Sequence, residues 1–208
     1  MSERRARLTR SALLLGFELV VTFAGVLAAF AVENWRDARG RSERARQVYA
    51  ALSQEVRNFA AAAPPLADTI RKSLDAFSAA RARGERPPPP VYYVAAGSER
   101  IPTEVWEATR TGGGLELIDP PLFFRTAQFY NRVNSISDRY ARYVAYTEAE
   151  VLPRLATPDA FYERSGALRP EFATYVDRLR DVHTLLAARV PDARRLVVEL
   201  DSARSRRR

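Results

Sequence analysis

ALLLGFELVVTFAGVLAAFAV, residues 12–32, is the stretch that decides the architecture of this chain. These 21 residues contain one charged side chain and no proline. At 1.5 Å per residue, a helix of this length spans about 31 Å, which matches the hydrocarbon core of a bilayer. A buried helix of a soluble protein normally has a polar stripe, and here only Glu18 and Thr22 are polar. The sequence therefore predicts a transmembrane helix over residues 12–32.

Both flanks of this segment are typical of a retained anchor. Residues 1–11 form a basic N-terminal segment, in which Arg10 lies beside the predicted membrane boundary. Trp35 follows the span at the level where tryptophans occupy membrane interfaces. We expect Arg10 and Trp35 to mark the two interfaces.

A cleaved signal peptide is the alternative interpretation, because Ala29-Phe30-Ala31 resembles an A-x-A cleavage site. The apolar run is longer than the usual h-region of about 7–15 residues. The helical pattern also continues without a break through Glu33 and Asn34. The prediction is that the mature chain keeps the segment.

The orientation of the anchor is decided by a narrow difference in charge. Four arginines precede the span and five follow it up to Arg46, so a count of basic residues is nearly balanced. The leading cluster is compact, as in a signal anchor. We therefore expect a single-pass protein of a bacterial inner membrane, with its large domain in the periplasm.

Polar and small residues inside the span share one face of the predicted helix. Glu18, Thr22, Gly25 and Ala29 are spaced four, three and four residues apart. Gly25-x-x-x-Ala29 is a small-xxx-small pair, which lets a second helix approach closely. Three roles stay open: packing between membrane helices, a Glu18 carboxylate extended to the headgroups near Arg10, or conduction of an ion or proton.

Residues 33–203 predict an all-α domain, a bundle of about four helices. Apolar residues recur at helical spacing in each long segment, as in Val48, Leu52, Val56 and Phe59. Pro64-Pro65 is expected to end the first helix of the domain, and a second closes near Gly84. RPPPP at 86–90 predicts a stiff extended linker.

Helix signals continue in the second half of the domain. Thr103 opens a short helix that ends at the glycines 112–114, and Asp119 caps a long helix that begins with two prolines. A last helix runs from Pro170 toward Ala203, and Pro191 should kink or divide it. The chain then ends in a basic tail, residues 204–208.

Composition excludes several classes of protein. The chain has no cysteine, so it contains neither disulfides nor a thiolate metal site. Its net charge is +8, but the excess of arginine lies at the two ends and the interior carries both signs. We predict no binding to nucleic acid, because no sustained basic face with interleaved aromatic residues is present.

Residues that could carry chemistry are few. His183 is the single histidine, and a zinc site built mostly from carboxylates is rare. Thr111-Gly112-Gly113-Gly114 follows a predicted helix and no lysine comes after it, so it predicts a turn and not a phosphate cradle. We predict no catalytic residue, no metal and no cofactor.

Two blocks of sequence resemble an uncharacterised family of small bacterial single-span membrane proteins. The first block runs from Gly25-Val26-Leu27-Ala28-Ala29-Phe30 to Glu33-Asn34-Trp35. The second comprises Glu104-Val105-Trp106-Glu107-Ala108, then Thr111-Gly112-Gly113 with Leu115, Ile118-Asp119, Leu122 and Phe129-Tyr130. The resemblance implies an anchor followed by a helical domain, and it implies no activity.

The sequence thus predicts a membrane-anchored helical interaction or structural protein, whose partners are the lipid bilayer and a second copy of itself or another membrane protein. The alternative is an enzyme or a transport accessory subunit with its site in a groove of the bundle.

Overall fold

A computed structural model describes the backbone of residues 2–93 and 100–207, and the side chains of residues 33–93 and 100–207. Within these ranges the protein is all-α, and β pairing is limited to one isolated bridge between Tyr162 and Leu168. The four α-helices are α1 (Ser2–Ala82), α2 (Glu104–Thr111), α3 (Pro120–Tyr146) and α4 (Pro170–Ser205). The all-α prediction and the helical bundle are confirmed.

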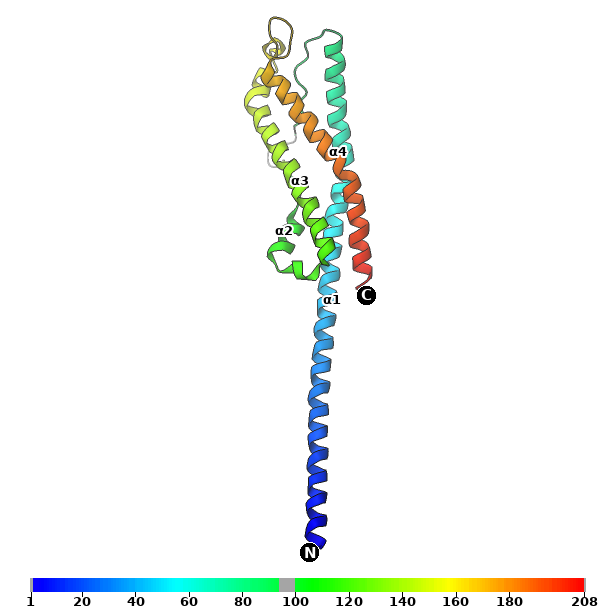
Figure 1. Ribbon diagram of the computed structural model, residues 1–208. Helices are drawn as coiled ribbons and strands as arrows, with labels where there is room; N and C mark the ends of the chain where they lie inside the picture. Colours follow the sequence, from blue (N-terminus) through cyan, green and yellow to red (C-terminus); the bar gives the residue numbers. More distant parts are fainter. Residues whose placement is uncertain (1, 94–99, 208) are drawn as a thin grey trace.

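Helix α1 is the axis of the molecule. Figure 1 shows its N-terminal part standing clear of the other helices and its C-terminal part running alongside α3 and α4. Residues 33–41 are exposed on every side, and burial begins at Ala45, which is 1% exposed. We call residues 33–44 the stalk.

The predicted transmembrane segment, residues 12–32, belongs to α1, but its side chains lie outside those that the structure describes. In the described part of the chain, no helix is long and apolar enough to cross a membrane.

The expectation that Pro64-Pro65 ends a helix is wrong, because α1 continues through both prolines to Ala82. A proline inside a helix removes one backbone hydrogen bond and crowds the preceding turn. Packing compensates for this cost here. Ala63, Ala67 and Ile70 are buried around the prolines, so the apolar face of α1 continues without a gap.

The core consists of two clusters stacked along the bundle. The cluster nearer the stalk packs α1 against α3 and α4, with Tyr49, Leu52, Tyr130 and Leu200 all at most 1% exposed. The distal cluster is rich in aromatic side chains: Tyr143, Phe161, Phe172 and Tyr175. Apolar positions on α1, α3 and α4 recur at helical spacing, and burial of that face holds the bundle together.

Helix α4 remains one helix across Pro191. Figure 1 shows α4 changing direction where its colour passes from orange to red, which is the stretch that contains this proline. The kink is thus confirmed, and α4 is not divided. Its C-terminal half returns along α1 toward the stalk.

The joint between α2 and α3 follows the predicted signals. Gly113 has φ of +73°, in the left-handed region that favours glycine, and it ends the α2 turn. Asp119 is the N-cap residue of α3 and Pro120 the first helical residue. The Asp119 carboxylate makes no capping hydrogen bond. It accepts instead from Arg207 at 2.6 Å, across to the end of the chain.

The proline-rich segment 86–90 lies against the distal end of the bundle. The Tyr162 hydroxyl donates to the Pro87 carbonyl, and the Tyr143 hydroxyl donates to the Pro90 carbonyl at 3.1 Å. The Tyr92 amide donates to the same Tyr143 hydroxyl at 3.0 Å. Proline has no amide donor, so the prolines of this segment can hydrogen-bond to the bundle only through their carbonyl oxygens. The tyrosine hydroxyls donate to two of these carbonyls and hold the segment in place.

Candidate functional site

The predicted residues of the membrane helix fall outside the described side chains, and so does the predicted interface arginine. These residues are Arg10, Glu18, Thr22, Gly25 and Ala29. Trp35 is described and stands 59% exposed on the stalk. The Arg39 guanidinium lies 5.1 Å from the centroid of its ring, a cation–π contact within α1.

A cavity of about 610 Å³ opens in the side of the bundle. Helix α1 forms one wall, α3 and α4 form the floor, and the segment leading into α2 forms the opposite rim. Most of the lining is apolar, as in Phe59, Ile70, Ile101, Val105, Ile136 and Leu186. Apolar cavities of this size are the usual sites for small organic ligands.

Glu55 joins three elements at the edge of this cavity. One carboxylate oxygen accepts the Val105 amide at 2.9 Å. The other accepts the Trp106 amide at 3.3 Å and the Tyr130 hydroxyl at 2.6 Å. These two amides lie in the first turn of α2, where backbone donors have no helical partner and the helix dipole favours an anion. Glu55 of α1 therefore fixes both α2 and α3 through one carboxylate.

Aromatic stacking supports the same contact. The Trp106 and Tyr130 rings lie 5.1 Å apart and within 3° of parallel. Burial, followed by the hydrogen bond and the charge of Glu55, raises the pKa of Tyr130 well above its ordinary value of 10.0. The hydroxyl therefore stays protonated and remains a donor to Glu55 across the physiological range.

Polar side chains at the cavity rim have different partners. Gln54 and Asn58 bond to each other at 2.8 Å along α1, and Ser137 accepts the Ile101 amide at 3.1 Å. Arg100 and Glu104 are exposed at the opening, and neither has a side-chain partner in the described part of the chain. The floor of the cavity is therefore apolar, and these charged side chains lie at its opening.

The residues that the sequence offered as possible carriers of chemistry lie away from the cavity. In the described ranges, no three metal-ligating side chains come together. His183 is half-buried on α4 and does not line the cavity. The glycines 112–114 form a turn between helices, as the sequence predicts.

The sequence suggested a groove of the bundle only as the alternative, and it identified neither the residues that line the cavity nor Glu55. A signal for Glu55 is present, because it lies three residues after Leu52 and four before Phe59, within a buried helical stripe. A carboxylate in such a stripe requires partners. The cavity carried no comparable signal, since its walls come from segments up to 135 residues apart, Ala51 to Leu186.

Comparison of the chain with protein-family models, with curated proteins and with solved structures found no match. The resemblance to small single-span membrane proteins remains a prediction from the sequence.

Proposed function

We propose that this protein is a single-pass helical interaction module of a bacterial inner membrane, which self-associates and holds its bundle on the periplasmic side. The observation that supports this most strongly is the continuity of α1 from Ser2 to Ala82. The apolar segment 12–32 and one wall of the bundle core thus belong to the same helix. An anchor of this kind connects the membrane to the domain without a flexible linker.

Helical phase supports self-association along α1. Continuing from Ala29 in further steps of three and four residues, the predicted packing stripe reaches Arg36, Gly40, Gln47, Gln54 and Ala61. All five are exposed, so this line of α1 is not used by the bundle. A second copy that packs on the stripe in the membrane therefore meets an open face of α1 above it.

The chemistry of that open face also favours a helix partner. Charged residues make up 28% of the chain, yet between Gln47 and Ala61 the one exposed charged side chain of α1 is Arg57, which pairs with Asp201 of α4 at 2.8 Å. The other exposed positions there are small or uncharged: Gln47, Ala51, Gln54, Asn58 and Ala61. Depletion of charge at a surface is typical of the centre of a protein interface.

The test compares two substitutions in the span of the full-length protein. Gly25→Leu places a bulky side chain where two backbones should meet, so we expect it to weaken association severalfold in a dimerisation reporter. Leu27→Ile lies off the stripe and serves as the control. Equal behaviour of the two variants would reject the stripe as the interface.

Glu18→Gln separates the roles of the carboxylate. Glutamine keeps hydrogen bonding and removes the titrating group. We expect association to be preserved, because a packing contact made through a hydrogen bond survives this change. Loss of a proton or ion flux with association intact identifies it as a conducting group.

The cavity supports a second candidate function, an accessory subunit that binds an apolar ligand in the groove of the bundle. A small apolar diazirine photolabel, mapped by mass spectrometry, should modify the lining residues. Ala62→Phe adds a ring at the α1 wall and should reduce this labelling, whereas Ala145→Phe, at an exposed position of α3 outside the lining, should not. Equal labelling of both variants would leave the cavity without a ligand role.

A further inference from the structure

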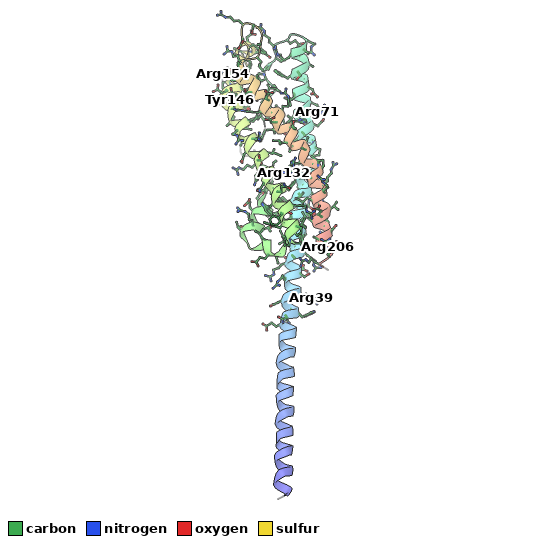
Figure 2. All side chains as sticks on the ribbon, in the orientation of Figure 1. Arg39, Arg71, Arg132, Tyr146, Arg154 and Arg206 are labelled. Atoms are coloured by element: carbon green, nitrogen blue, oxygen red, sulfur yellow. The ribbon has the colours of Figure 1, made fainter. Side chains whose placement is uncertain are left out.

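The end of the bundle nearest the stalk brings basic residues of the stalk together with those at the C-terminal end of α4. The Ser42 hydroxyl on α1 donates to the Arg207 carbonyl at 2.6 Å, and the Arg207 guanidinium bonds to Asp119. These contacts hold the end of α4 beside the stalk. Figure 2 shows Arg206 at the base of the bundle and Arg39 below it on α1.

Most carboxylates at this base already have arginine partners. Glu43 pairs with Arg46, and Asp119 pairs with Arg207. Asp201 accepts from Arg57 at 2.8 Å and from Ser53 at 2.9 Å, which ties α4 to α1. These ion pairs leave the remaining arginines of the base unneutralised.

Five arginines of the base have no carboxylate partner in the described part of the chain: Arg36, Arg39, Arg41, Arg44 and Arg206. Two carboxylates of the stalk, Glu33 and Asp37, have no basic partner there either. All seven side chains are exposed. The stalk and Arg206 together therefore carry an excess of three unpaired positive charges that face outward.

The length of the stalk places this charge close to a bilayer. Ser42 lies ten residues beyond Val32, the end of the predicted span, which is about 15 Å along a helix. The headgroup layer occupies about 5–7 Å of that distance. Ser42 thus stands about 8–10 Å above the headgroups, close to the screening length of about 8 Å at physiological salt, and Arg36 and Arg39 lie nearer to the headgroups.

We propose that the base of the bundle, formed by the stalk arginines and Arg206, binds the anionic phospholipid headgroups of the membrane that α1 crosses. This inference rests on the proposed function, because only an anchored chain holds the base at this height. Phosphate oxygens are strong acceptors for guanidinium donors. Each arginine near an anionic surface raises the apparent affinity about fivefold.

The test uses the full chain in nanodiscs, with a fluorophore on Ser205→Cys at the base and a nitroxide quencher on a minor neutral lipid. Addition of phosphatidylglycerol to phosphatidylcholine should favour a tilt of α1 that brings the base onto the headgroups, and quenching should rise severalfold. Salt at about 0.5 M should reverse this rise, because the screening length shortens. A fluorophore on Ser165→Cys at the distal end should not respond.

Paired variants separate a local site from net charge. Arg39→Gln with Arg206→Gln should lower the apparent affinity for phosphatidylglycerol about 25-fold, from two factors of five. Arg142→Gln with Arg164→Gln removes the same charge from exposed distal positions and should leave quenching unchanged. An equal loss with both pairs overturns the inference, because the effect is then one of overall charge.

Flotation with neutral vesicles after an alkaline wash distinguishes failure of the anchor from failure of the headgroup site. A chain that does not float overturns the proposed function and this inference with it. A chain that floats, but whose base shows no response to phosphatidylglycerol, overturns this inference alone.

Discussion

Glu55 serves three donors with one carboxylate, and two of those donors belong to the first turn of α2. Glu55→Ala should lower the free energy of unfolding by about 2 kcal/mol, because hydrogen bonds to charged groups contribute about 1.5–3 kcal/mol each and water replaces part of them. Chemical denaturation of the full chain measures this loss.

Glu107→Ala is the matched control for Glu55→Ala. In the described part of the chain, the Glu107 side chain bonds to Arg110 alone, one turn away on α2, and it is 42% exposed. Its removal should change the free energy of unfolding by less than about 0.5 kcal/mol. Comparable losses in the two variants would contradict the structural role of Glu55.

The buried tyrosines predict a loss of stability in alkali. Burial raises the pKa of Tyr130, Tyr143 and Tyr175 above the ordinary value of 10.0. Each tyrosine contributes fully to the free energy of unfolding at a pH below its pKa in the unfolded chain. This contribution is lost as the pH rises from that value toward the pKa of the tyrosine in the folded protein. With three such tyrosines, the free energy of unfolding should fall by up to about 4 kcal/mol per pH unit above pH 10.

Unfolding curves between about pH 8 and pH 11.5 measure this slope. Tyr130→Phe should reduce it by about a third, because phenylalanine does not titrate. An unchanged slope in this variant would mean that Tyr130 is accessible to hydroxide in the folded state.

At the scale of elements, the sequence predicted most helix ends correctly. Thr103, Gly113, Pro120 and Pro170 lie at or next to the ends of α2, α3 and α4, because capping and φ preferences act locally. The error at Pro64-Pro65 has the opposite origin. Packing of α1 against the rest of the bundle outweighs the local cost of two prolines, and that packing is not visible in a local pattern.

Pro65→Ala should therefore stabilise the protein. Pro65 is exposed, so alanine restores one backbone hydrogen bond of α1 without disturbing the core. We expect a gain of about 1–3 kcal/mol, as measured by thermal unfolding in detergent. Pro89→Ala is the control. Pro89 is buried in the proline-rich segment that packs against the bundle, so this substitution should destabilise the protein.

At the scale of the whole molecule, the sequence indicated a helical bundle but not the return of its C-terminus to the stalk. The contacts of Arg207 with Ser42 and Asp119 join residues 165 and 88 positions apart. No local pattern encodes such pairs. The sequence therefore showed that the tail is rich in arginine, but it did not show that the tail packs beside the stalk.

Orientation in the membrane is a prediction at this scale. The chain has no cysteine, so Ser165→Cys at the exposed distal end provides one reactive thiol. A membrane-impermeant maleimide should label it in intact spheroplasts. Labelling that requires lysis would place the bundle in the cytoplasm.

The unbroken length of α1 also acts as a ruler. Ala82 lies fifty residues beyond Val32, so in the proposed membrane topology, with α1 along the membrane normal, the far tip of the bundle would stand about 75 Å above the hydrocarbon boundary. Leu152 and Leu155, each 37% exposed, lie at that end. A partner that binds the tip would have to extend to this height above the membrane. A compact protein that lies on the lipid surface would not reach it. Deleting whole turns from the stalk would lower the tip by about 5.4 Å per turn.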